Sequence, residues 1–484
     1  MGLFDRCILV DYTINIKNTL YANPPVNDSE LTLQPEDYSL LTDLYQLTMA
    51  ACYCGEGLDQ RSASFELSVR RLPEGFGYLI AMGLAQALEY LEQFRFTSAH
   101  LAQLQATGLF THAPERFWSL LAEAHFSGDV WAVPEGTAVF AQEPLLRVEA
   151  PLWQAQIVET YLLNVLNYQT LIATRAARLR DIAGTEATLL EFGTRRAFSP
   201  QASLWAARAA LAAGLDATSN VLAALKLGRH PSGTMAHALV MALGAMEGSE
   251  AEAFTAFHRY FPGAPLLIDT YDPIAAAEGL AEQVKLGKMQ LEGIRLDSGD
   301  LVTLSQKVRS LLPGVAIFAS GDLDEWKIAD LQAAGACIDG YGLGTKLVTG
   351  APVNGVYKLV EIDGIPVMKE SDGKQTYPGR KQIFRQLEQG IVRGDRLGLL
   401  TESLQSVESP CEEKPLMQLM VKQGQRLQAP ESLDTIAQRT AQSVASLPPT
   451  TRQLNQPLSP PVSFSAALLD LTQKTRRNPA RSEK

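Results

Sequence analysis

The spacing of apolar positions changes twice along the chain, near residue 150 and again near residue 350. Before residue 150, SASFELSVRRLP and SGDVWAVPEGTAVFAQEPLLRVEAP have the alternation and the Val, Trp and Phe content of strands. LLTDLYQLTMAACY predicts a helix with start signals at Thr42 and Asp43. GYLIAMGLAQALEYLEQF predicts an amphipathic helix whose apolar face is formed by Leu79, Met82, Leu84, Leu88 and Leu91.

The middle of the chain, residues 151–350, has a different pattern. A long helical run over 154–182 is followed by short apolar strands that alternate with Ala-rich helices, such as ATLLEFG before SLWAARAALAAG. About six such units predict parallel β/α structure, and we expect an irregular β/α barrel with its active site at the C-terminal ends of the strands. An open doubly wound sheet follows a similar rule and remains an alternative.

After residue 350, VYKLVEIDGIPVMKES and KQTYPGRKQIFR again have the pattern of β-hairpins. We expect residues 351–484 to rejoin residues 37–150 in a discontinuous α/β domain, with residues 1–36 as an N-terminal extension. A Pro-rich stretch from about residue 447 precedes a short predicted helix, FSAALLDLTQK.

Composition narrows the class of protein. Of the 484 residues, 46% are hydrophobic and 20% charged, which is typical of a globular protein with large cores. A net charge of −11 argues against nucleic acid or an anionic membrane as partner. The five cysteines are widely spread, which argues against a disulfide framework. Since no segment has the pattern of a membrane span or a signal peptide, we expect a cytoplasmic protein.

Polar side chains follow several of the predicted strands directly. In EFGTRRAFSP, Phe192 could stack on a flat ring, and Arg195 and Arg196 could pair with phosphate or carboxylate. In GIRLDSGDL, Asp297 and Asp300 could accept hydrogen bonds from ribose hydroxyls or hold a metal through water. The alternatives are a surface ion pair beside a core Phe, and a helix N-cap formed by one of the two acids.

Two glycine-rich turns and one acidic turn also follow predicted strands. SGDLDE and GYGLGT predict close approach of main-chain N–H groups to an anion at Gly321, Gly342 and Gly344, or else tight βα turns. In LLIDTYDP, Asp269 and Asp272 fit a capped turn equally well. A ring-stacking aromatic, arginines, a carboxylate and phosphate loops together indicate a reaction between a ring and a phosphorylated sugar.

One histidine stands out. His237 lies in SGTMAHALVM, where a Gly-Thr turn opens an apolar run. It could be a packed core histidine, a ligand, a base or a nucleophile, and from the residues alone packing is the commoner use.

The motifs TDLYQLTM, FELSVRRLP, EFGTRR, GTMAHA, IDTYD, RLDSGDL, GLGTKLVT and PGRKQIFR occur in the order found in nicotinate phosphoribosyltransferases, which the chain resembles from about residue 37 to 470. The resemblance implies a β/α barrel beside an α/β domain. It also implies formation of nicotinate mononucleotide and pyrophosphate from nicotinate and phosphoribosyl pyrophosphate in NAD salvage. Magnesium and ATP hydrolysis would take part, and the enzyme would be a homodimer with active sites at the subunit interface.

The resemblance also implies roles for single residues. His237 would be the histidine that ATP phosphorylates, and Phe192 would stack on the pyridine ring beside Tyr45 of the partner subunit. Arg195 would lie near the nicotinate and the phosphates, and Arg295 and Asp297 would flank the ribose and the ring. The other substrate-binding positions are Thr194, Ser219 and Asn220, with Gly321 and Asp322 at the ribose and Gly342, Gly344 and Thr345 at the 5′-phosphate.

One position bears on the choice between nicotinate and nicotinamide. Nicotinamide-using relatives have an Asp where this chain has ATSN, with Ser219 and Asn220. A neutral hydroxyl does not repel a carboxylate and Arg195 attracts one, which favours nicotinate over nicotinamide. The chain departs from many relatives at Ala238, where they have Ser or Glu. A quinolinate enzyme would need more converging cations, and a catalytically silent nucleotide-binding scaffold of the same fold is the alternative from another class.

Overall fold

The computed structural model describes residues 31–370, 376–404 and 411–477. One region of the molecule is built on a seven-stranded antiparallel sheet in the order β13-β12-β1-β5-β3-β17-β18. Strands from before residue 150 form the centre of this sheet, and strands from after residue 350 flank them on both sides. The strands are β1 (Ser62–Val69), β3 (Asp129–Ala132), β5 (Pro144–Pro151), β12 (Gly355–Ile362), β13 (Ile365–Pro366), β17 (Gln418–Lys422) and β18 (Gln425–Arg426).

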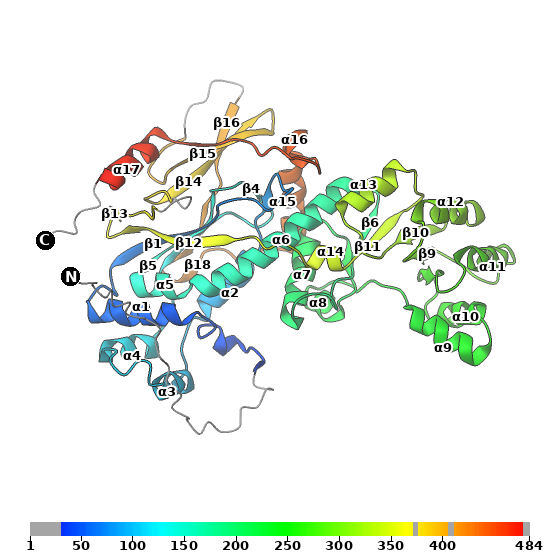
Figure 1. The fold of residues 1–484 in the computed structure, drawn as a ribbon, viewed down its shortest axis with the longest axis horizontal. Helices are drawn as coiled ribbons and strands as arrows, with labels where there is room; N and C mark the ends of the chain where they lie inside the picture. Colours follow the sequence, from blue (N-terminus) through cyan, green and yellow to red (C-terminus); the bar gives the residue numbers. More distant parts are fainter. Residues whose placement is uncertain (1–30, 371–375, 405–410, 478–484) are drawn as a thin grey trace, which may run out of the picture.

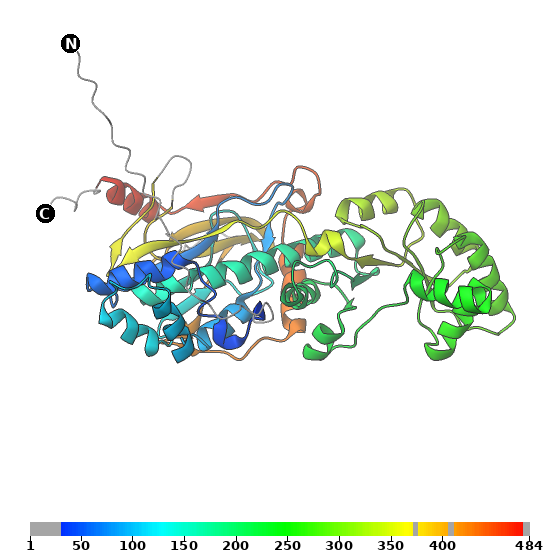
Figure 2. The same ribbon diagram turned by 60° about the horizontal axis from the view of Figure 1, so that its bottom comes forward.

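A four-stranded sheet in the order β16-β14-β15-β19 completes this region. The early helices and α17 lie on opposite sides of the strands (Figure 2). The strands are β14 (Lys381–Glu388), β15 (Ile391–Leu399), β16 (Cys411–Pro415) and β19 (Val462–Phe464). The helices are α1 (Leu44–Gly55), α2 (Leu84–Glu92), α3 (Ser98–Ala106), α4 (Glu115–Ala122), α5 (Leu152–Ile157), α15 (Leu433–Ala445), α16 (Pro449–Arg452) and α17 (Ala466–Arg477).

The second region is a six-stranded sheet in which every neighbouring pair is parallel, in the order β7-β6-β11-β10-β9-β8. The first strand, β6, pairs with the last, β11, so the order is cyclic. A barrel would have this cyclic order, but β7 and β8 are not paired among the described strands, so the predicted barrel stays a prediction. The strands are β6 (Thr188–Glu191), β7 (Ala217–Thr218), β8 (Leu266–Leu267), β9 (Gly293–Leu296), β10 (Ala316–Ala319) and β11 (Gly340–Leu343).

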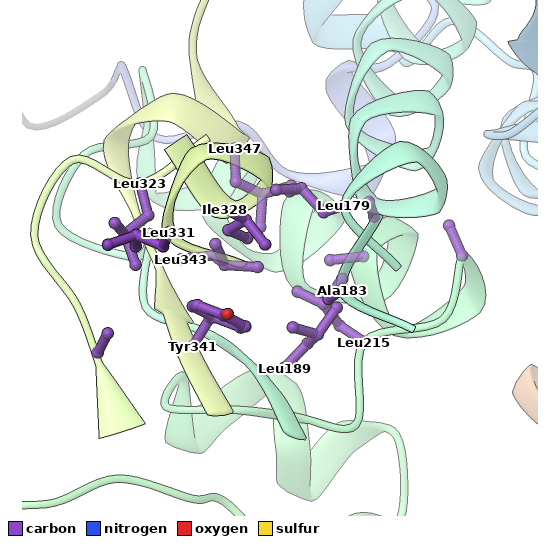
Figure 3. Close-up of a cluster of buried hydrophobic side chains, with 14 of the residues drawn as sticks. Leu179, Ala183, Leu189, Leu215, Leu323, Ile328, Leu331, Tyr341, Leu343 and Leu347 are labelled. Atoms are coloured by element: carbon purple, nitrogen blue, oxygen red, sulfur yellow. The ribbon is translucent and has the colours of Figure 1, made fainter. Parts of the chain in front are cut away.

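Helices follow these strands, as the alternation of short apolar runs and Ala-rich segments predicts. Small residues such as Ala206, Ala209 and Ala210 are fully buried and let α7 approach its neighbours closely. Figure 3 shows part of the resulting core, with Leu189 and Tyr341 of the sheet beside Ile328 and Leu331 of α13. The helices are α7 (Pro200–Ala212), α8 (Val221–Lys226), α9 (His237–Glu247), α10 (Glu250–Tyr260), α11 (Pro273–Lys285), α12 (Leu301–Leu311), α13 (Glu325–Ala333) and α14 (Thr345–Val348).

One long helix, α6 (Glu159–Ala183), runs from the first region to the second (Figure 1). Its first half contributes Leu162 and Val165 to the core of the antiparallel region, and its second half contributes Ile172 and Leu179 to the core of the parallel region. The helical run predicted over 154–182 is therefore helical, but it is divided at Val158 into α5 and α6.

The helix predicted over residues 77–94 is wrong in its first half. Leu79 and Ile80 form β2, which pairs with β4 (Ala138–Val139), and α2 begins only at Leu84. Gly83 has a φ of +99°, a left-handed conformation that separates strand from helix and that favours glycine. The predicted helix start at Asp43 is confirmed, since Asp43 is the extended N-cap residue of α1.

Several other expectations can be compared with the structure. The strands and hairpins predicted at 62–73 and after residue 350 are confirmed, as is the last helix, α17. The domain boundaries at 36, 150 and 350 stay predictions, and residues 1–30 of the extension lie outside the described residues. Cys52, Cys54, Cys337 and Cys411 are free thiols, and Cys7 lies outside the described residues. Within the described ranges, no helix is long and apolar enough to cross a membrane.

Candidate functional site

The C-terminal ends of the six parallel strands meet at one edge of the second sheet, because neighbouring parallel strands point the same way. The polar motifs singled out in the sequence follow these strands directly. They come from five strand ends: Phe192, Thr194 and Arg195 after β6, Ser219 and Asn220 after β7, Asp297 after β9, Gly321 and Asp322 after β10, and Gly344 and Thr345 after β11. Arg295 and Gly342 lie near the ends of the strands β9 and β11, one residue before the last.

The turns after β6 and β11 are in direct contact. The N–H of Phe192 donates to the carbonyl oxygen of Leu343 at 2.7 Å. A Cβ at Gly342 would overlap the Phe192 ring, so only glycine leaves room for the ring at this place. Thr194 and Arg195, in the same turn as Phe192, are exposed. The turn therefore presents a half-buried aromatic ring beside an accessible guanidinium group.

The Arg295 guanidinium is the most desolvated cation at this edge. Its Nη1 donates to Thr234 Oγ1 at 2.6 Å, whereas its buried Nε has no hydrogen-bond partner within the described part of the chain. Burial lowers the pKa of Arg295, and the nearby Arg195 guanidinium lowers it further, against the opposing effect of Asp297 and Asp269. A buried donor without a partner beside a second cation is suited to binding an anion.

Asp297 is held from several sides. Its N–H donates to Asp269 Oδ2 at 2.8 Å, and its Oδ1 accepts a hydrogen bond from Ser320 Oγ. Gly321 has a φ of +93°, and a Cβ there would overlap the main-chain oxygen of Asp297. The carboxylate is thereby fixed between the turns after β9 and β10, and Asp322, also at positive φ, is exposed at the second turn.

Further carboxyl groups gather next to this position. Glu250, the first residue of α10, has its pKa raised by burial and then by the charges of Asp269 and Asp272. Glu250 Oε1 and Asp269 Oδ1 are buried and lack hydrogen-bond partners among the described residues. No group of three or more His, Cys, Asp or Glu side chains in the described ranges is arranged to hold a metal ion by itself.

His237 begins α9 and is half-buried. Its Nδ1 lies 3.1 Å from Thr270 Oγ1, on the turn that follows β8. The ring is therefore not a fully packed core histidine. One ring nitrogen has a hydroxyl partner, and no partner of the other is recorded among the described residues.

Some of the polar residues that the sequence motifs singled out are helix N-caps. Asp300 Oδ1 accepts hydrogen bonds from the N–H groups of Val302 and Thr303, so Asp300 is the N-cap of α12. Asp272 caps α11 in the same way. Asn220 is buried, and its Oδ1 accepts from Ala223 N at 3.0 Å at the start of α8. The capping alternative is therefore the correct one for Asp300 and Asp272, and Asn220 has a structural role that its motif did not indicate.

Tyr45 is not brought to this edge within one chain. It lies on α1, in the antiparallel region, with 47% of its surface exposed. It borders a groove of about 360 Å³ whose other walls include Met49, Phe65, Glu159 and Tyr357. An exposed tyrosine at an open groove is consistent with contact to another molecule.

Three residues at the edge were missed by the sequence reasoning: Thr234, Thr270 and Ser320. Each is a small hydroxyl residue that contacts a singled-out side chain, Arg295, His237 and Asp297 respectively. Thr270 and Ser320 directly follow or precede motif residues, but nothing in the pattern distinguishes such hydroxyls from ordinary turn residues.

Comparison with known families gives three matches. The models described as nicotinate phosphoribosyltransferase (NAPRTase) N-terminal domain, NAPRTase family and nicotinate phosphoribosyltransferase C-terminal domain match residues 40–167, 187–316 and 380–472. A nicotinate phosphoribosyltransferase of Mycobacterium tuberculosis is 42% identical over 427 residues, which cover 86% of this chain and 89% of the relative. The human nicotinate phosphoribosyltransferase is 34% identical over 510 residues, covering 89% and 95%.

Solved structures agree with this result. The crystal structure of human nicotinic acid phosphoribosyltransferase has a TM-score of 0.79 and 32% identity, covering 90% of this chain and 99% of that chain. A structure of nicotinate-nucleotide pyrophosphorylase from Pyrococcus furiosus has a TM-score of 0.71 at 24% identity, over 86% and 98%. At that identity the second likeness concerns the fold alone.

Proposed function

The chain belongs to the nicotinate phosphoribosyltransferase family and is an enzyme of that family, and we propose that it forms nicotinate mononucleotide and pyrophosphate from nicotinate and phosphoribosyl pyrophosphate. The observation that carries the proposal is Arg295, whose buried Nε lacks a partner among the described residues at the edge where Arg195 and Asp297 also lie. This reaction would place the enzyme in NAD salvage.

The chemistry at this edge follows from charge. When the bond between C1 of the ribose and the pyrophosphate oxygen breaks, positive charge develops on C1 and the ring nitrogen of nicotinate bonds to it. Asp297 is the carboxylate that would stabilise the cationic sugar, with Gly321 and Asp322 beside the ribose. Phe192 would stack on the pyridine ring, and Arg195 and Arg295 would pair with the carboxylate of nicotinate and with phosphate oxygens. The loop over 342–345 would take the 5′-phosphate through its main-chain N–H groups.

Magnesium suits the donor set only together with a substrate. Mg²⁺ is commonly held by one or two carboxylates plus substrate phosphates rather than by a complete protein cage. Asp269, whose buried Oδ1 lacks a partner among the described residues, and Asp297 would be those carboxylates. When bound, the ion would neutralise charge on the leaving pyrophosphate.

ATP coupling would pass through His237. The contact between Nδ1 and Thr270 Oγ1 leaves Nε2 as the candidate nucleophile, since a neutral imidazole nitrogen can attack the γ-phosphorus of ATP. The N–P bond would form as the bond to ADP breaks, and hydrolysis of the phosphohistidine would return the free ring. The added negative charge would act on the segment that includes Thr234 and, through it, on Arg295.

A homodimer is part of the proposal. Tyr45 lies on α1 and does not reach the strand ends of its own chain, and its groove is open. Insertion of this tyrosine into the partner subunit's site would put it against the same pyridine ring. Nicotinate is favoured over nicotinamide because Ser219 is neutral and Arg195 is exposed at the neighbouring turn.

The test is an assay with nicotinate or nicotinamide, phosphoribosyl pyrophosphate and magnesium, each with and without ATP. We expect nicotinate mononucleotide as the product, a larger kcat/KM for nicotinate, and stimulation by ATP. In His237→Ala the rates with and without ATP should become equal while a basal rate remains. A larger kcat/KM for nicotinamide would overturn the substrate assignment, and full ATP stimulation of His237→Ala would overturn the phosphohistidine.

A further inference from the structure

Two side chains of α6 contact the main chain of the segment that follows β11. Arg175 donates from Nη1 to the carbonyl oxygens of Lys346 and Thr349, and Tyr168 donates from its hydroxyl to the carbonyl oxygen of Val348 at 3.1 Å. The two residues are seven positions apart, which is about two helical turns, so they lie on one face of α6. Together they hold three carbonyl groups of the segment that continues the 342–345 loop.

The environment of Arg175 shows how closely it is fitted. Gly350 has a φ of +136°, and a Cβ there would overlap the guanidinium group, so the main chain passes directly over the charge. Burial lowers the pKa of Arg175, and the neighbouring Arg178 lowers it further against the opposing effect of Glu325 and Asp324. A desolvated guanidinium group contributes little to a soluble surface. Because it donates to main-chain carbonyls, it fixes the position of the backbone that it contacts.

The supported segment cannot shift independently of the loop. Leu347 and Val348 are buried, and Leu347 lies in the same core as Leu179 of α6 (Figure 3). Val348 also packs against Gly193, where a Cβ would overlap its side chain. Gly344 and Thr345 directly precede these anchored residues. Because α6 runs back into the core of the antiparallel region, the loop is fixed to a helix that is packed into both cores.

We propose that Arg175 and Tyr168 are positioning residues, which hold the main-chain N–H groups of the 342–345 loop in place for the 5′-phosphate of phosphoribosyl pyrophosphate. The proposal rests on the proposed function, because it concerns the substrate of that same site. Neither side chain is assigned a contact with the substrate.

The same helix supplies a matched control. Arg180 also donates to main-chain carbonyls, from Nε to Gly214 at 2.8 Å and from Nη1 to Gly184 and Ala187 at 2.8 and 2.6 Å. These carbonyls precede β6 and β7, at the opposite edge of the parallel sheet from the candidate site. Replacing Arg180 therefore removes a comparable support without touching the phosphate loop.

The test compares Arg175→Met, Arg175→Lys, Tyr168→Phe and Arg180→Met with the parent enzyme. The readouts are kcat and KM for both substrates, the Kd of ribose 5-phosphate and the Tm. For Arg175→Met we expect kcat/KM for phosphoribosyl pyrophosphate to fall at least about tenfold and ribose 5-phosphate to bind about tenfold more weakly. KM for nicotinate at saturating phosphoribosyl pyrophosphate should change less than about threefold. Arg175→Lys should recover part of the loss, and Tyr168→Phe should lose about two- to fivefold.

The outcomes separate the proposals. If Arg180→Met weakens ribose 5-phosphate as much as Arg175→Met, or if a folded Arg175→Met binds it like the parent, the positioning role is wrong. If Arg175→Met does not fold, a normal ribose 5-phosphate Kd in both Arg175→Lys and Tyr168→Phe overturns it. A parent enzyme that makes no nicotinate mononucleotide would instead overturn the proposed function.

Discussion

Buried charges are arranged differently in the two regions of the molecule. In the antiparallel region they form ion pairs within the chain, and one of these, Glu66–Lys381, joins a strand from before residue 150 to a strand from after residue 350. The closest pairs are Glu66–Lys381 at 2.8 Å, Arg147–Glu149 at 2.7 Å, Arg385–Asp395 at 2.7 Å and Arg396–Glu413 at 2.8 Å. At the strand ends of the parallel sheet, Arg295 lies near Asp297 and Asp269 without forming a close ion pair among the described residues, and like charges are also near, with Arg195 beside Arg295 and Glu250 beside two aspartates.

This difference distinguishes charges that stabilise the fold from charges that a bound ligand could pair with. Single atoms without partners also occur in the antiparallel region, at Arg147 Nη2 and Glu143 Oε1, but each belongs to a group with an opposite charge beside it. Arg295 and Asp269 also attract each other, but neither forms a close ion pair within the described part of the chain, and each has a like charge nearby, Arg195 or Glu250. Burying such groups costs free energy that a bound anion or cation can recover.

Breaking a pair in the antiparallel region should have the largest effect. Arg385→Met would leave Asp395 and Glu143 buried together without a cation, and the pKa of Glu143 is already raised by burial and by Asp395. We expect the free energy of unfolding at neutral pH to fall by about 3–5 kcal/mol, measured by urea denaturation. The loss should be smaller at low pH, where Glu143, whose pKa is raised, can be protonated.

An exposed pair is the control for this prediction. Asp470 and Lys474 of α17 lie 2.6 Å apart with 59% and 72% of their side chains exposed. Lys474→Ala should change stability by less than about 0.5 kcal/mol. If it costs as much as Arg385→Met, overall charge rather than burial of pairs determines the stability of this region.

The corresponding change at the strand ends should act on the reaction and spare the fold. Arg295→Met removes a desolvated cation whose Nε lacks a partner among the described residues. We expect kcat/KM to fall by about 10²–10³-fold, the size of effect seen when one donor to a developing charge is removed. The urea midpoint should stay the same or rise, because the cost of burying the guanidinium group outweighs its attraction to Asp297 and Asp269. A variant that loses stability and activity together would mean that Arg295 supports the fold, like Arg385.

Much of the fold follows from the sequence because the long antiparallel strands show a period and the short parallel strands are apolar runs between Ala-rich helices. The alternation in Ser62–Val69 and the repeated strand-helix units both predict what the structure contains. The error at residues 77–83 has a physical cause, since β2 has two residues and a pair that short has no period to detect. Its partner, β4, lies about sixty residues further along the chain.

The site is predictable in part for a different reason. Residues that directly follow parallel strands reach one edge whatever the loop details, so Phe192 and Asp297 could be placed together from order alone. The side chains that orient the residues of the site could not be predicted, because their contacts join residues that lie far apart in the sequence. Thr234 is 61 residues from Arg295, Thr270 is 33 from His237, and Arg175 is 171 from Lys346. Only packing of the chain brings such residues into contact.

The smallest expected effect concerns the carboxyl group that begins α10. A helix N-terminus favours a carboxylate, so the raised pKa of Glu250 means that burial and repulsion by Asp269 and Asp272 outweigh this effect. A carboxyl whose pKa is raised in the folded state destabilises the fold above that pKa and has no such effect below its unfolded value of about 4.3. Glu250→Gln should therefore match the parent near pH 4 and become more stable as the pH rises towards neutral, by less than about 1 kcal/mol because the group is partly exposed.

Urea midpoints of Glu250→Gln and the parent, measured across this pH range, test the prediction. A variant that is less stable than the parent at neutral pH would mean that the Glu250 charge is compensated inside the chain, and the contrast between the two regions would then be confined to Arg295.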